Sequence, residues 1–138
     1  MASKDGRSER PALSKAHYCF RDASKGQLVC EQVEVADSFN ARLKGLLFTK
    51  PLPPGYGLLL TPCASIHMFF MTYAIDAVFL DKSGVVIAVL SNFKPWRLSR
   101  AYAKAKSCLE MIAGEAARNG IKIGDRLVLE KRQFIESP

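Results

Sequence analysis

The stretch Ile75-Asp-Ala-Val-Phe-Leu-Asp-Lys-Ser-Gly-Val-Val-Ile-Ala-Val-Leu90 decides the fold class of this 138-residue chain. Two apolar runs, residues 75–81 and 85–90, flank the polar turn sequence Asp81-Lys-Ser-Gly84. Short apolar runs rich in Val and Ile, joined by a turn that ends in Gly, are typical of a β-hairpin. We therefore expect two antiparallel strands here.

Other short strands are expected on both sides of this hairpin. Residues 17–21 and 28–35 are joined by turn formers at 22–26, which predicts a second hairpin. Further strands are expected at 57–61, 65–71, 108–112 and 126–130. Many short strands separated by turns favour a mainly-β fold, a compact single-domain β-barrel or sandwich.

Helices are expected to be few. Asp37 suits a helix N-cap, and apolar residues follow at helical spacing, which predicts a helix over 37–47. Shorter helical segments are expected after Ser99 and within 114–120. Residues 1–14 are polar and are expected to form a flexible arm, which leaves 15–138 as the single mainly-β domain.

The net charge is +7, from 20 Lys and Arg against 13 Asp and Glu. This balance disfavours a carboxylate-rich metal enzyme and leaves an anionic partner open. The excess is concentrated in residues 91–107, which hold five basic residues and no acidic one. The positive net charge therefore reflects this segment more than the domain as a whole.

The four cysteines, Cys19, Cys30, Cys63 and Cys108, show no C-x-x-C spacing, so free and mostly buried thiols are expected. No apolar stretch approaches the ~20 residues of a membrane-spanning helix. A cytoplasmic location is expected unless a leader has been removed, and a monomer is the default.

Five pieces of the chain share their order and spacing with a known family. They are residues 36–48, 57–59, 66–84, 109–114 and 119–125. Through them, the run from Val33 to Leu129 resembles the domain of unknown function 192 family, a group of small prokaryotic proteins. The resemblance implies a mostly β, barrel-like or sandwich fold and brings no established reaction.

The resemblance also singles out particular residues. The Arg and Gly of the family's helix fall on Arg42 and Gly45, its acidic strand residue on Asp76, and its Glu between hydrophobic neighbours on Glu110. The sequence departs from the family where Leu47 replaces a common Met and in the segment 72–74. Such departures would alter specificity if these residues contact a ligand.

Asp76 and Glu110 are acids in otherwise apolar strands, and a buried carboxylate needs a partner. Arg42 is the first candidate partner and His67 the second. Two interpretations stay open: a structural ion pair that fixes register, or a polar floor beneath a ligand cleft.

His67 lies in an apolar run, four residues after Cys63. A lone Cys-x-x-x-His is a poor zinc pattern, so no metal and no other cofactor are predicted. The simpler interpretation is a histidine whose nitrogens bond to backbone groups or to a carboxylate.

The basic segment, residues 94–106, interleaves cations with aromatic rings. Its candidate anion-binding residues are Lys94, Trp96, Arg97, Arg100 and Lys104. Five cations on a loop would support only weak, salt-sensitive binding of nucleic acid, and no known nucleic-acid fingerprint accompanies them. The alternative is a solvated loop with Trp96 packed on the core. A nucleic-acid partner is not expected.

The leading hypothesis is a non-catalytic small-ligand binding or accessory module. Its partner would be a small ligand or a neighbouring protein. Its cleft would be lined by Arg42, His67, Asp76 and Glu110, with the basic segment at the rim. One alternative is a small hydrolase-like or carbohydrate-active enzyme that uses Asp76 and Glu110 as paired carboxylates. Another is a weak anion or nucleic-acid binder that uses the basic segment.

Overall fold

Seven strands form one sheet in the order β5-β4-β6-β3-β2-β1-β7. The computed structural model describes residues 18–36, 51–69 and 71–132. The strands are β1 (Tyr18–Asp22), β2 (Gln27–Ala36), β3 (Tyr56–Leu60), β4 (Ile75–Leu80), β5 (Val86–Phe93), β6 (Ser107–Ile112) and β7 (Leu127–Lys131). The single described helix is the short α2 (Glu115–Arg118). The fold is mainly β, as predicted, and the helix predicted over 37–47 lies outside the described residues.

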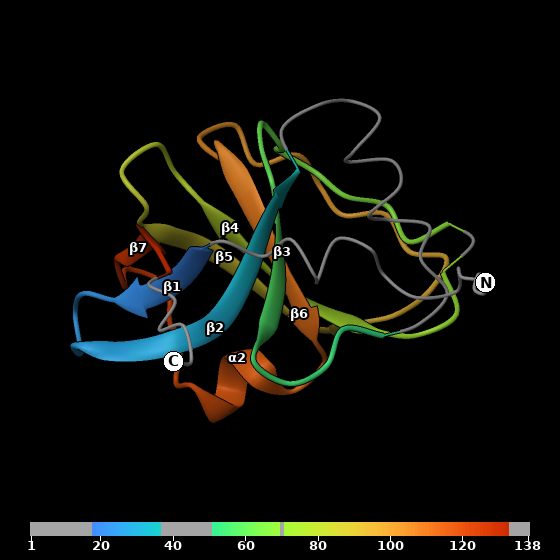
Figure 1. The fold of residues 1–138 in the computed structure, drawn as a ribbon. Coiled ribbons are helices and arrows are strands. Elements are labelled where there is room, and N and C mark those ends of the chain that lie inside the picture. The colour runs from blue at the N-terminus through green and yellow to red at the C-terminus, as the bar shows by residue number, and fades with distance from the viewer. Residues whose placement is uncertain (1–17, 37–50, 70, 133–138) are drawn as a thin grey trace.

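The sheet curls into a half-barrel (Figure 1). Its two ends in the strand order, β5 and β7, approach each other beside the turn between β4 and β5. There Val85 and Arg126 form an isolated antiparallel bridge. The Leu127 N–H donates to the carbonyl oxygen of Gly84 at 2.8 Å, and the Val86 N–H donates to Asp125 at the same distance. These bonds hold the curled sheet together at one end.

Both predicted hairpins are confirmed. β1 pairs antiparallel with β2, and β4 pairs antiparallel with β5. The second turn needs its glycine, because Gly84 has a φ of +83° and a Cβ there would overlap the carbonyl oxygen of Leu127. Gly84 therefore permits the close approach between this turn and β7.

The sheet buries both of its faces. Val78 and Leu80 of β4 belong to an inner cluster inside the curl, which draws residues from every strand and from α2. Ala77 and Phe79 point the other way into an outer cluster. All six residues of β4 are therefore buried. A strand buried on both faces favours a continuous apolar sequence, which is what the opening stretch shows.

Irregular segments cover the outer cluster: residues 61–69 with 71–74, and residues 94–106. Backbone hydrogen bonds join them: the Ser99 N–H donates to Ile66, and the Tyr102 N–H donates to Ala64. The strand predicted over 65–71 is wrong, because among its described residues only His67 pairs, in an isolated bridge with Leu98. The helix predicted after Ser99 is also absent from this described segment.

Candidate functional site

Asp76 is a structural carboxylate inside the half-barrel. It is 1% exposed. Its Oδ1 accepts the Asn92 N–H at 2.8 Å, and its Oδ2 accepts the N–H groups of Gly114 and Ala116, both at 2.9 Å. The carboxylate therefore ties β4 to the end of β5 and to the start of α2. Three hydrogen bonds from separate backbone positions to one buried carboxyl group fix the loop before α2.

Asp76 and Glu110 lie on opposite faces of the sheet. In the β4–β6 ladder, Asp76 is opposite Met111, and Glu110 is opposite Ala77. Directly opposite residues share a face and successive residues alternate, so the two acids point in opposite directions. The prediction that they line one cleft is wrong, and the paired-carboxylate hypothesis loses its geometry.

The acid that shares a face with Glu110 is Glu34 of β2. Leu58 lies between them, opposite Glu34 on one side and opposite Glu110 on the other. Two strand spacings put their backbones about 10 Å apart. Glu110 is 2% exposed and belongs to the outer face. Sequence alternation did not single out Glu34, because β2 is only partly buried there.

His67 lies on the outer side, in the segment that covers the outer cluster. Its ring stacks on Phe69 with 4.9 Å between centroids. Its Nδ1 is buried and has no hydrogen-bond partner in the described part of the chain. Arg42, the predicted partner of the acids, lies outside the described residues. The structure therefore separates Asp76 from His67 and Glu110.

All four cysteines are free thiols. Burial raises the pKa of Cys108 well above its ordinary value, and a hydrogen bond with the Cys63 thiol raises it further. Burial also raises the pKa of Cys30 to about 12. Thiolates are the reactive form of cysteine, so Cys30 and Cys108 are protected from nucleophilic chemistry at neutral pH.

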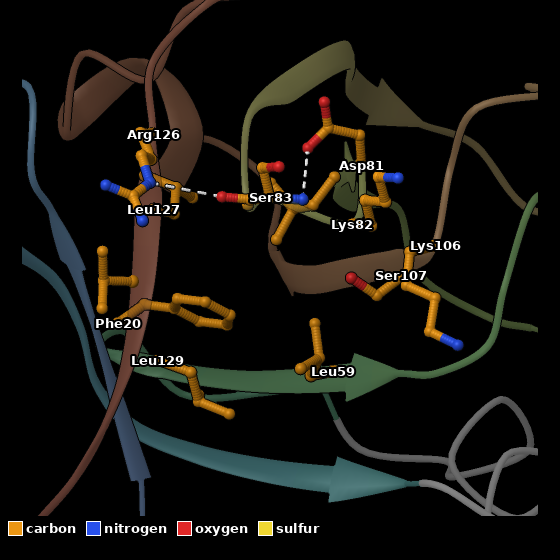
Figure 2. Close-up of a pocket in the computed structure, with 13 residues that line it drawn as sticks. Phe20, Leu59, Asp81, Lys82, Ser83, Lys106, Ser107, Arg126, Leu127 and Leu129 are labelled. Carbon is orange, nitrogen blue, oxygen red and sulfur yellow. Dashed lines mark hydrogen bonds between the residues drawn. The ribbon is translucent and has the colours of Figure 1, made fainter.

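An open cavity of about 270 Å³ lies at one end of the half-barrel, which we call the mouth cavity (Figure 2). Its floor is apolar and comes from β1, β3, β4 and β7. These floor residues are Phe20, Leu59, Leu80, Leu127 and Leu129. Figure 2 shows Phe20, Leu59 and Leu129 on one side and the residues of the β4–β5 turn across from them.

The rim of the mouth cavity is cationic. Lys82, Lys106 and Arg126 are exposed lining residues, and Asp81 is the one acid among the described lining residues. Asp81 is already engaged, since its Oδ1 accepts the N–H groups of Ser83 and Val85. The Arg126 Nε donates to the carbonyl oxygen of Ser83 at 3.3 Å, which orients the guanidinium along the rim.

Sequence reasoning did not find this cavity. Its cations lie in the β4–β5 turn, directly before β6 and directly before β7, in the separate segments 81–84, 106–107 and 126–129. Lys106 was visible as part of the basic segment, but nothing local connects it to Lys82 or Arg126. Curling of the sheet brings the three together.

A second cavity, of about 310 Å³, lies beside α2. Its charged lining residues are Glu31, Glu115 and Arg118, and Arg118 forms an ion pair with Glu115. This cavity therefore lacks the cationic excess of the mouth cavity.

The basic segment lies at the surface. Lys94, Arg97, Arg100 and Lys104 are exposed, as is Trp96, which is 61% exposed. The alternative that packs Trp96 on the core is therefore wrong. The described residues contain no cluster of three or more His, Cys, Asp or Glu side chains that could hold a metal ion. None of the described helices is long and apolar enough to span a membrane.

Comparison with known proteins places this arrangement among uncharacterised ones. The family model DUF192, described as "Uncharacterized ACR", matches residues 20–129. A UPF0127 protein of Thermococcus sibiricus is 36% identical over 124 residues, 83% of this chain and 79% of that protein. A UPF0127 protein of Pyrococcus furiosus is 35% identical over 112 residues, 77% of this chain and 93% of that protein.

Two solved structures share the fold. A protein of unknown function from Novosphingobium aromaticivorans matches with a TM-score of 0.70 and 24% identity, over 81% of this chain and 83% of that one. A protein from Sinorhizobium meliloti, described as a candidate transcription regulator, matches with a TM-score of 0.68 and 25% identity. That match covers 82% of this chain and 92% of the other.

Proposed function

The chain belongs to the uncharacterised DUF192 family, and we propose that it is a non-catalytic binding module for a small organic anion with an apolar body. The ligand would occupy the mouth cavity. The observation that carries this proposal is the combination of an apolar floor with three exposed cations at the rim, Lys82, Lys106 and Arg126.

The position and the size of the cavity support this function. Small-molecule sites often lie in the mouths of β-barrels, where a few polar groups orient a ligand against apolar walls. The volume of about 270 Å³ is slightly below the range of about 300–1,000 Å³ typical of ligand pockets, so a small ligand fits best. An apolar body would cover Leu59 and Leu129, and its anionic group would face the rim.

The polar groups of the cavity favour binding over acid–base chemistry. Asp81 is the only carboxylate among the described lining residues, and two backbone N–H groups occupy its Oδ1. His and Cys are absent from this described lining. A general acid or base needs a group free to exchange a proton with the substrate.

This proposal moves the ligand away from the cleft predicted from the sequence. Asp76 faces the interior and is fully engaged, while Glu110 and His67 lie on the outer side. A role for Arg42, His67 and Glu110 in ligand binding stays a prediction. The variant Glu110→Gln in the experiment below tests it.

The test is a thermal-shift titration of the full chain with hexanoate, octanoate and benzoate. A ligand that binds only the folded state raises the melting temperature as its concentration rises. Hexanol, octanol and benzyl alcohol control for the apolar body alone. The double variant Lys82→Gln/Lys106→Gln should lose the shift, and the matched surface variant Lys122→Gln should keep it.

Three results would overturn the proposal. The first is the absence of any shift with all three carboxylates, and the second is an equal shift with the alcohols. The third is a shift that survives in Lys82→Gln/Lys106→Gln but disappears in Glu110→Gln, which would return the ligand to the outer face. NMR of the bound carboxylate over hours should show it chemically unchanged, as a non-catalytic module requires.

A further inference from the structure

A second surface, whose residues do not line the mouth cavity, combines exposed apolar side chains with cations. We call it the aromatic-basic surface, formed by Phe69, Lys94, Trp96, Arg97, Leu98 and Arg100. Phe69 is 38% exposed, Trp96 61% and Leu98 67%. These values make them three of the most exposed large hydrophobic residues in the described chain, and exposed apolar groups beside charges often mark an interaction site.

The surface is assembled from two segments by backbone hydrogen bonds. The Trp96 N–H donates to the Met68 carbonyl oxygen, and the Met68 N–H donates to the Arg97 carbonyl oxygen, both at 2.7 Å. Met68 itself is fully buried in the outer cluster. The exposed rings are therefore attached to a rigid part of the fold.

The rings form a continuous stack. His67 stacks on Phe69 at 4.9 Å with an interplanar angle of 28°, and Phe69 stacks on Trp96 at 6.1 Å with an angle of 30°. The indole stands at the exposed end of this stack. A flat ring added to the series would find a pre-ordered aromatic partner there.

The backbone of Trp96 adopts an unfavourable conformation. Its φ is +66°, in the left-handed region that bulky residues rarely enter. Strain of this kind persists only where the surrounding structure enforces it, and it concentrates at functional positions. The hydrogen bonds on either side of Met68 enforce it here.

The charged residues of the segment that carries Trp96, residues 91–107, are all positive. Lys94, Arg97 and Arg100 are exposed, and no acidic residue occurs between positions 91 and 107. The Arg100 guanidinium lies 5.2 Å from the centre of the Tyr102 ring. This cation–π contact restrains the position of the Arg100 side chain. A ligand for this surface would thus offer flat rings and repeated negative charge.

Contrary to the expectation from the sequence, we propose that the aromatic-basic surface binds single-stranded nucleic acid, because the structure adds an exposed ring stack to the cations. A base continues the stack on Trp96, and neighbouring phosphates contact Arg97, Arg100 and Lys94. Stacking on aromatic side chains combined with cations along the backbone is how proteins bind single strands without sequence preference. A double helix would not suit the surface, because its bases are already stacked inside it.

Trp96 is the only tryptophan, so the protein carries its own probe. Titration of the full chain with an oligothymidylate in 20 mM salt should quench the Trp96 fluorescence to saturation. Binding should weaken roughly 20-fold between 50 and 200 mM salt if about three phosphates are contacted, one by each of the three cations. The same titration with vesicles of phosphatidylcholine and phosphatidylserine should leave the emission unchanged.

Variants measured by anisotropy of a labelled oligothymidylate locate the site. Trp96→Ala should weaken binding by about tenfold. Arg97→Gln/Arg100→Gln should weaken it and also reduce its salt dependence, because fewer counterions are then released. Lys122→Gln and Ile123→Ala are the matched controls: Lys122 and Ile123 are exposed, Ile123 to 69%, and they lie outside the surface.

Trp96→Gly separates folding from function. Gly tolerates a φ of +66°, so this variant should keep or raise the melting temperature while it loses binding. The proposal is overturned by any of three results: no fluorescence change with the oligonucleotide in 20 mM salt, equal affinity in Trp96→Ala, or a blue shift with vesicles alone. The last would identify the surface as a membrane contact.

Discussion

The Asp76 carboxylate on β4 accepts the backbone N–H of Ala116 in α2 at 2.9 Å, across 40 residues of sequence. Gly114, which precedes α2, has no side chain that could cap the helix. The Asp76 side chain on β4 therefore caps its N-terminus. The first N–H groups of a helix lack partners within it and must find them elsewhere. The helix therefore depends on a residue that the sequence suggested as a ligand contact.

Asp76→Asn should lower the free energy of unfolding by about 2–4 kcal/mol, since an amide has one acceptor oxygen and turns N–H donors toward the backbone donors. Urea unfolding measures this loss. Asp81→Asn is the control, because Asp81 accepts two backbone N–H groups in an exposed turn and its loss should cost less. Equal losses in the two variants would contradict the capping role of Asp76.

Gly84→Ala should destabilise the protein by about 2–3 kcal/mol and weaken ligand binding in the mouth cavity. A Cβ at this position would overlap the Leu127 carbonyl oxygen, and the φ of +83° adds strain. Gly124→Ala is the matched control, because Gly124 also has a positive φ of +97° but a Cβ there meets nothing within 4 Å. Gly124→Ala should lower the free energy of unfolding only by the backbone strain, about 1 kcal/mol. A lower melting temperature for Gly124→Ala than for Gly84→Ala would contradict this explanation.

The buried Cys30 thiol should make the protein less stable at high pH. Its pKa rises from 9.0 to about 12 on folding, so the folded state holds the proton longer than the unfolded state. The stability contributed is complete below pH 9 and is lost as the pH rises toward 12. The expected loss is about 1.4 kcal/mol per pH unit in that window. Urea unfolding between pH 8 and 10.5 should show this slope reduced in Cys30→Val.

Ser99→Ala should loosen the contact between the two segments that carry the aromatic-basic surface. The Ser99 Oγ accepts the Ile66 N–H at 2.9 Å, and both residues are buried. Removal of the hydroxyl deprives a buried N–H of this bond and should cost about 1–3 kcal/mol. Hydrogen exchange at the Ile66 amide should accelerate, whereas Ser91→Ala, at an exposed position of β5, should leave it unchanged.

The strands that follow local patterns were predictable from the sequence. Both hairpins, the short β3 and β6, and the final strand lie within a few residues of their predicted bounds, because apolar runs and turn formers act over neighbouring positions. The segment 65–71 was not predictable in this way. Ile66 and Met68 are buried on one side as in a strand, but their backbone bonds go to the irregular segment 94–102, and the Met71 N–H donates to the Met68 carbonyl oxygen.

In the candidate sites too, the sequence predicted local features but not contacts between distant residues. The sequence identified Asp76 and Glu110 as acids in apolar strands, and both are buried. It could not say which face each acid occupies, because an offset of one position in the β4–β6 register reverses the direction of a side chain. It identified the cations around Trp96, but not Phe69 as the partner of that ring.

The sequence by itself determined the mainly-β class, the hairpins, the family and the concentration of charge in residues 91–107. These properties depend on residue type and local spacing. Only the tertiary structure decided that Asp76 caps a helix, that Lys82, Lys106 and Arg126 surround one cavity, and that Phe69 meets Trp96. The physical reason is that these contacts form only when the sheet curls and distant segments pair. Curling and pairing depend on the packing of the two apolar clusters on the two faces of the sheet, and many residues contribute to that packing.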